Sequence, residues 1–220
     1  MSVKIDGDVR SRFLGLTILL TSLTGVTTVK SSLQLEEFKK QVLQEVSGEY
    51  KLEALKDVYL FRVYRDFFWG IGIDPTKTRP ASEALIRRVL AGKPIPQINT
   101  LVDAYNLASI KTGVPLAAFD ADTITGELQA RFAKPDEEFS GIGMDKPAKL
   151  KGGEIVITDD EKLVAIYPHR DSDKTKVQES THNLLLVTCG APRVIAEILS
   201  KAERTAVDYI IRFCDGQQKK

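Results

Sequence analysis

The spacing of hydrophobic residues changes along the chain, and this change limits the folds that the chain can adopt. In the first half, apolar side chains recur every three or four residues, which is the spacing of one helix face. From residue 116 to residue 187 the pattern becomes short apolar runs separated by turn residues, which is typical of strands. Helices in one part and strands in another predict a mixed α/β fold rather than alternating βαβ units.

Several of the expected helices have recognisable ends. Asn99 can cap a helix at its start, and Gly113, followed by Pro115, suits the left-handed residue that ends one. The β-branched stretch 13–29 predicts a core strand or hairpin; it is too short and too polar for a membrane helix and lacks the features of a signal peptide. The expected helices are Leu33–Val46, Ala54–Trp69, Pro80–Leu90, Thr100–Thr112 and Pro192–Cys214.

Length and charge give a second set of expectations. The 220 residues correspond to one large domain or two small ones, and residues 215–220 are expected to be a frayed tail. A net charge of +1 provides no global attraction for nucleic acid or membrane, so we expect no membrane partner, and any RNA contact must be local. Two cysteines without a CxxC motif favour a reducing, cytoplasmic setting, and the oligomeric state stays open.

A basic segment between Arg62 and Lys93 is one candidate for RNA contact. It has seven basic residues and three acidic ones, interleaved with aromatic residues. Basic groups neutralise phosphates and aromatic rings stack on unpaired bases, so the segment resembles an RNA-facing strip. The alternative, which we favour on the sequence alone, is an amphipathic helix with core aromatics and solvated arginines. The expected RNA-binding residues are Lys77, Arg79, Arg87 and Arg88.

The densest polar cluster is "YPHRDSDKT", residues 167–175, which follows an apolar strand. Loops at the ends of strands often carry function, and His169 and Asp171 have the chemistry for proton transfer. Arg170 can bind an oxyanion, and Ser172 and Thr175 add hydroxyl groups. An ordinary turn, in which these side chains bond to nearby backbone, explains the cluster equally well.

Several common motifs are absent from the sequence. "WGIGID" lacks the third glycine of a dinucleotide loop, and no Walker lysine, HExxH or GxSxG motif occurs. The spacings of His169, His182 and Cys189 match no standard zinc pattern. We therefore expect no metal and no cofactor.

Three segments in order, "INTLVDAYN", "GVPLAAFD" and "LLLVTCGAP", resemble the tRNA-editing B3/B4 domain of the phenylalanyl-tRNA synthetase β subunit. Two further segments, "YRDFFWGIGIDPTKTRPASEALIRR" and "YPHRDSDKT", resemble motifs of stand-alone proteins built from that domain. The chain has nothing that resembles the adenylate-forming site of a synthetase. The resemblance implies a three-layer sandwich of mixed sheet and helices and a pocket that hydrolyses the ester of a mischarged tRNA. It also implies a single domain over 1–220, with 1–50 as an N-terminal strand-plus-helix extension of that domain. It places the family's pocket asparagine on Asn106, with Tyr105 in place of the neighbouring threonine.

The chain departs from the family pattern at two positions. The family's histidine falls on Ala117, and its acidic residue, which reads a tyrosine hydroxyl in the synthetase, falls on Val187. The resemblance therefore does not imply specificity for tyrosine, and an apolar Val187 favours a smaller or apolar side chain. Catalysis would need a substitute for the missing histidine, and His169 is the candidate.

The leading hypothesis is a trans-acting editing protein that binds tRNA or aminoacyl-tRNA and hydrolyses its ester. In this hypothesis His169, oriented by Asp171, positions water, Arg170 binds an oxygen of the substrate, and Asn106 faces them and binds the amino group. One alternative is a non-catalytic module that binds RNA or aminoacyl-tRNA. Another is a protein that binds a free small molecule resembling an amino acid.

Overall fold

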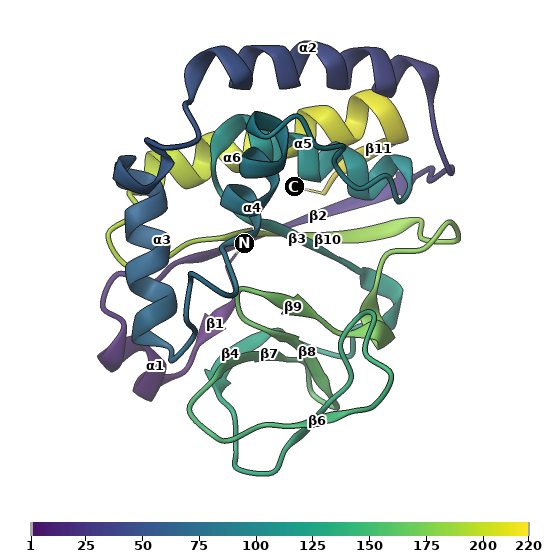
Figure 1. Ribbon diagram of the computed structural model, residues 1–220. Helices are drawn as coiled ribbons and strands as arrows, with labels where there is room; N and C mark the ends of the chain where they lie inside the picture. The colour runs from purple at the N-terminus through teal and green to yellow at the C-terminus, as the bar shows by residue number, and fades with distance from the viewer. Residues whose placement is uncertain (1, 220) are drawn as a thin grey trace.

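The computed structural model describes residues 2–219, which form two main β-sheets lying face to face (Figure 1). The first sheet is antiparallel, in the order β11-β2-β10-β3. The second has the order β1-β4-β7-β8-β9 and is mixed, because β1 runs parallel to β4. The strands of the first sheet are β2 (Ile18–Val26), β3 (Leu116–Asp120), β10 (Asn183–Cys189) and β11 (Asp215–Gln218); those of the second are β1 (Lys4–Ile5), β4 (Gln129–Phe132), β7 (Ile155–Thr158), β8 (Leu163–Ile166) and β9 (Arg170–Asp171).

Helices cover the face of the first sheet that points away from the second (Figure 1). Helices α5 and α6 pack directly on this face, and α2 lies outside them against α4 and α5. The order of helices, sheet and sheet is the expected three-layer α/β sandwich. The helices are α1 (Gly7–Arg12), α2 (Leu33–Glu49), α3 (Tyr59–Gly70), α4 (Ala81–Leu90), α5 (Thr100–Thr112) and α6 (Ala196–Cys214), with short 3₁₀ turns η1 (Leu55–Asp57), η2 (Ala121–Thr123) and η3 (Asp173–Thr175) and a small hairpin of β5 (Glu138–Phe139) and β6 (Ala148–Lys149).

Strand β10 lies inside the sandwich and is covered on both faces. Leu184 and Leu186 pack under the helices, whereas Val187 and Cys189 face the second sheet. A strand with two covered faces needs apolar residues at successive positions rather than in alternation. This explains the continuous apolar run at residues 184–187.

The predicted ends of α5 are confirmed. The side chain of Asn99 accepts a hydrogen bond from the Val102 N–H at 2.9 Å, and Gly113 adopts φ 74°. Three other helix predictions are wrong in detail. The helix expected over Leu33–Val46 continues to Glu49. The helix expected from Ala54 is interrupted at Val58, which is extended, so that η1 and α3 are separate. The last helix begins at Ala196 rather than at Pro192, because Arg193 has φ 72° and Ile195 is extended.

The prediction of a frayed C-terminal tail is also wrong. Residues Asp215–Gln218 form β11, which pairs with β2 at the edge of the first sheet; residue 220 lies outside the described residues. Asp215 has φ 56°, which turns the chain from α6 into the strand. The tail is polar and has no apolar pattern that would predict a strand. It forms one because the edge of β2 offers backbone groups for pairing.

Candidate functional site

A small cavity of about 80 Å³ lies where β3 and β10 of the first sheet face β7 and β8 of the second. Most of its wall is apolar, including Phe119, Ile157 and Ala165. The segment that follows β8 adds two groups with acid–base chemistry, His169 and Asp171. The cavity therefore combines an apolar wall with a carboxyl group and an imidazole.

Two buried tyrosines connect the elements around this cavity. The Tyr167 hydroxyl donates to the Gly190 carbonyl at 2.6 Å, and the Tyr64 hydroxyl donates to the Cys189 carbonyl at 2.7 Å. These bonds join the end of β8 and helix α3 to the end of β10. A cis bond between Tyr167 and Pro168 lies between β8 and β9. The polar segment that begins at His169 thus follows a firmly anchored residue.

His169 is half-buried at the cavity wall. Its backbone N–H donates to the Ile166 carbonyl at 2.9 Å, which forms the turn. Burial, with a further contribution from the positive charge of Arg170, lowers the pKa of His169 from 6.5 to about 4. At neutral pH the imidazole is therefore uncharged and has one donor nitrogen and one acceptor nitrogen.

Asp171 is the acidic group of the cavity. Burial raises the pKa of its carboxyl group from 3.8 to about 7. The charge of Asp171 in turn contributes to the raised pKa values of Tyr105 and Cys189, although burial is the larger cause for both. A carboxyl group with a pKa near 7 exists in both protonation states at neutral pH, which suits a general acid or base.

The other predicted site residues of the polar cluster, Arg170, Ser172 and Thr175, lie outside this cavity. Arg170 is exposed and donates to the Ile142 carbonyl at 3.3 Å. Ser172 is buried and accepts a hydrogen bond from the Lys174 N–H at 3.3 Å, as an ordinary turn would predict. Thr175 is fully buried, and its hydroxyl has no hydrogen-bond partner within residues 2–219.

Tyr105 and Asn106, the predicted substrate residues on α5, are also not among the residues that line the cavity. Tyr105 is buried between α5, α6 and the first sheet, and Asn106 is half-buried on α5. The structure brings His169 and Asp171 together at one cavity, but Asn106 does not line it. The role of Asn106 in binding an amino group stays a prediction.

Ala117 and Val187, the two departures from the family pattern, meet at this cavity. They pair with each other across β3 and β10, and both line the wall. Two residues 70 positions apart in the sequence are therefore direct neighbours at the candidate site. Sequence reasoning missed Ala81, Phe119 and Cys189, which also line the cavity; as apolar residues and a lone cysteine they carry no distinctive signal.

Most aromatic side chains of the expected RNA-binding strip, residues 62–93, are not available to RNA. Its aromatic residues Tyr64, Phe67 and Phe68 are buried in the core, so they cannot stack on bases; Trp69 is 57% exposed. Arg88 donates two hydrogen bonds to the Pro94 carbonyl, at 3.0 and 2.8 Å. The burial of these aromatic residues agrees with the alternative hypothesis of an amphipathic helix with core aromatics, and Trp69 is the exception.

Only part of the basic set on this strip is available to a ligand. Arg87 binds the buried carboxylate of Glu83 at 2.7 Å, and Arg65 binds the same carboxylate from α3. These charge pairs lower the pKa of Glu83 even though burial alone would raise it. Lys77 and Arg79 are exposed just before α4, and they remain the better candidates for contact with a phosphate.

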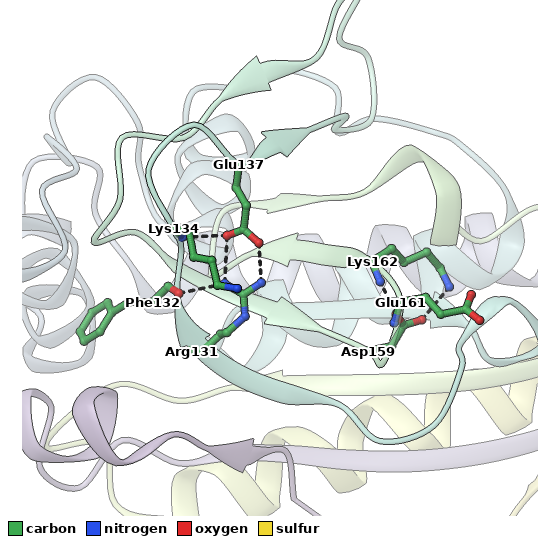
Figure 2. Close-up of polar contacts among 7 residues, drawn as sticks. All are labelled: Arg131, Phe132, Lys134, Glu137, Asp159, Glu161 and Lys162. Carbon is green, nitrogen blue, oxygen red and sulfur yellow. Dashed lines mark hydrogen bonds and ion pairs between the residues drawn. The ribbon is translucent and has the colours of Figure 1, made fainter.

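A larger depression, of about 620 Å³, lies on the second sheet and under the β5–β6 segment. Figure 2 shows that several of its charges are paired with each other. Arg131 binds both carboxylate oxygens of Glu137, at 2.9 and 2.5 Å, and Lys162 binds Asp159 at 2.6 Å. The Asp159 carboxylate also accepts bonds from backbone N–H groups of its own turn. These pairs stabilise loops.

Comparison with known proteins decides the family. The B3/4 domain family matches residues 63–214, which include the whole cavity wall. The chain belongs to the B3/4 domain family. Its expected resemblance to the synthetase domain is confirmed. Strand β2 and helices α1 and α2 lie outside the matched residues of this B3/4 protein.

The relatives of this B3/4 protein are β subunits of phenylalanine–tRNA ligase. The β subunit of Psychrobacter arcticus is 38% identical over 88 residues, covering 40% of this chain and 11% of the relative. That of Staphylococcus saprophyticus is 30% identical over 167 residues, covering 75% of this chain and 19% of the relative. The chain thus spans less than a fifth of the length of either relative.

Among solved structures, the fold is similar to an N-terminal fragment of the phenylalanyl-tRNA synthetase β subunit from Pyrococcus horikoshii. The TM-score is 0.52 at 12% identity, covering 99% of this chain and 50% of the fragment. This likeness supports the fold. Within residues 2–219, no helix has the length and hydrophobicity to cross a membrane, and no three His, Cys, Asp or Glu side chains are grouped as metal ligands.

Proposed function

We propose that this B3/4 protein hydrolyses the ester bond between a wrong amino acid and tRNA, and that the reaction takes place at the cavity of His169 and Asp171. The observation that carries the proposal is the position of these two groups beside Ala117 and Val187. The resemblance assigns pocket residues of the family to those two positions. The proposal is supported because His169 and Asp171 line the same cavity as these two positions.

The chemistry needs few protein groups. Asp171 accepts a proton from water as the water oxygen attacks the ester carbonyl carbon. The bond from this carbon to the ribose oxygen then breaks, and the ribose oxygen takes up the proton held by Asp171, which returns to its carboxylate form. His169, which is neutral at pH 7, offers a hydrogen bond to water or to the carbonyl oxygen. Arg170 lies outside the cavity, so its proposed contact is with the tRNA backbone at the rim.

The test is deacylation of a panel of mischarged tRNAs by the wild-type protein and by Asp171→Asn. We expect the variant to lose ~10²-fold or more in rate, which is typical of a positioned acid–base group. The matched control is Asp173→Asn, an exposed aspartate two residues further along the chain. Equal rates for wild type and Asp171→Asn would contradict the proposed role of Asp171, and the absence of hydrolysis by wild type would contradict the function.

The alternative is a B3/4 module that binds aminoacyl-tRNA without hydrolysing it. The apolar pair of Ala117 and Val187 favours this alternative, because the family has polar residues at both positions. Binding that weakens with salt but is not followed by hydrolysis would support it. Either function concerns tRNA and implies a cytoplasmic protein, with which the two buried, unpaired cysteines are compatible.

A further inference from the structure

A groove of about 320 Å³ lies at the end of the sandwich formed by α1 and α3, beside the loop that leads from β10 to α6 (Figure 1). None of its lining residues lines the cavity of His169 and Asp171, so the groove is separate from the proposed reaction site. Helix α1 and the turn after it lie outside the residues that match the family. The groove therefore depends on a part of the chain that the family match does not include.

The floor of this groove is apolar. Phe13, Val63 and Phe67 line it, and all three are buried in the core. The rings of Phe13 and Phe67 meet edge to face, with their centroids 5.3 Å apart, and Pro192 adds to the wall. A hollow with a packed apolar floor can accept a large apolar side chain from a binding partner.

Four large hydrophobic side chains that are exposed to solvent surround the groove. Leu14 lines it and is 77% exposed. Trp69 directly precedes one lining residue, and Ile195 follows another, Arg193, by two positions. The hydroxyl of Tyr59, which is also exposed, donates to the Arg193 carbonyl at 3.4 Å. Single exposed hydrophobic residues are ordinary, whereas a group of them around a groove indicates an interaction surface.

The charges around the groove are mainly positive. Arg12 lines it and donates to the Gly70 carbonyl at 3.1 Å. Arg193 forms an ion pair with Asp66 at 2.6 Å, and both side chains of the pair are more than half exposed. Arg62 lies on the same exposed face of α3, one turn before Asp66. Within residues 2–219 neither Arg12 nor Arg62 has a carboxylate partner, so the surface attracts an acidic ligand.

This combination favours a protein partner over a nucleic acid. A phosphate backbone needs cations but not an apolar hollow, and the Asp66 carboxylate would repel it. Protein interfaces, in contrast, concentrate aromatic residues and arginine around pockets that accept an apolar anchor. We propose that the groove binds an acidic amphipathic segment of a partner protein, with the apolar side chains of the segment in the hollow and its carboxylates beside Arg12 and Arg62.

The first experiment selects peptides from a random display library on the immobilised full chain, with Leu14→Ala as the counter-selection. We expect the selected peptides to carry large apolar residues at helical spacing together with Asp and Glu. One of them is then synthesised, and its affinity is measured by fluorescence anisotropy. Selected sequences that are rich in Lys and Arg, or a selection that yields no peptide, would overturn the inference.

The second experiment measures the affinity of this peptide for single variants. We expect Trp69→Ala to weaken binding roughly thirtyfold, the scale of an interface hot spot. Arg12→Gln should weaken binding and reduce its dependence on salt, whereas Asp66→Asn should strengthen it about threefold, the scale of one exposed charge pair. The matched control for Leu14→Ala is Leu33→Ala, a leucine on α2 that is 85% exposed and outside the groove. Thermal unfolding verifies that each variant is folded.

The third experiment tests two other occupants of the groove. Sedimentation shows whether the wild type dimerises, and dimers that dissociate in Leu14→Ala would make a second copy the occupant. Binding of a single-stranded RNA that is lost in both Leu14→Ala and Trp69→Ala would make RNA the occupant. Either result would overturn the inference, as would equal affinity of the peptide for wild type and Trp69→Ala. None of these assays uses ester hydrolysis, so this inference and the proposed function can fail independently.

Discussion

Replacing Asp171 with asparagine should change the pH dependence of stability in a direction that follows from its burial. The pKa of Asp171 is about 7 in the folded protein and 3.8 when unperturbed. Between these values the folded state holds a proton that the unfolded state has released, so stability decreases as pH rises from about 4 to about 7. One pKa unit corresponds to about 1.4 kcal/mol, so the full loss is roughly 4 kcal/mol.

His169 has the opposite effect over nearly the same range. Its pKa is about 4 in the folded protein and 6.5 when unperturbed, mainly because of burial. Below pH 6.5 the unfolded state takes up a proton that the folded state does not accept until about pH 4. Stability is therefore lost as pH falls through this window, by roughly 3 kcal/mol.

In the wild-type protein the two effects oppose each other between pH 4 and pH 6.5. Asp171→Asn removes the aspartate effect, so its stability relative to wild type should be lower at pH 4.5 than at pH 7. His169→Gln removes the histidine effect, so its stability relative to wild type should be lower at pH 7 than at pH 4.5. Other buried acids, such as Glu83, contribute equally to all three proteins and cancel in the differences.

The assay is urea unfolding, followed by circular dichroism, at several pH values between 4.5 and 8. At pH 8 we expect Asp171→Asn to be more stable than wild type by ~1–4 kcal/mol, because asparagine carries no charge into the cavity. Asp173→Asn, at an exposed position, should follow the wild-type curve. If the Asp171→Asn curve were parallel to the wild-type curve from pH 4.5 to pH 8, the pKa reasoning would be refuted.

Three further predictions concern other parts of the molecule. Gly190→Ala would place a Cβ 2.1 Å from the Thr17 carbonyl oxygen, so we expect a loss of about 3 kcal/mol or more in urea unfolding. Deleting residues 215–220 should lower Tm by several degrees, because it removes β11 from the edge of β2. Replacing Lys77 and Arg79 together with alanine should reduce the slope of log affinity for tRNA against log salt by about 2.

Each of these three predictions has its own control. Gly48→Ala lies within α2, where a Cβ meets nothing within 4 Å, so it should keep stability or raise it by up to ~1 kcal/mol. If deletion of only 219–220 lowered Tm as much as the longer deletion, β11 would not be the cause. For the salt slope the control is Lys56→Ala with Lys146→Ala, two exposed lysines outside the cavity wall. If the double variant of Lys77 and Arg79 has the same salt slope as wild type, these two residues do not contact tRNA phosphates and only face solvent.

Features that depend on a few neighbouring residues were determined by the sequence itself. Asn99 and Gly113 mark the ends of α5 because a cap and a left-handed residue act within one turn of a helix. The apolar run at residues 184–187 likewise indicated a strand, which the structure forms as β10. The ordered motifs around Asn106 and Val187 were enough to indicate the family, because residue types and their order can be recognised in the sequence alone.

The site itself was decided by tertiary structure. Alternation along β9 turns Asp171 toward the cavity and leaves Arg170 exposed, although the two are adjacent in the sequence. The pairing of β3 with β10 makes Ala117 and Val187 neighbours, and a free edge of β2 converts a polar tail into β11. The pKa of Asp171 depends on how much water the surrounding strands exclude. Burial is set by contacts between segments far apart in the chain, which local patterns do not encode.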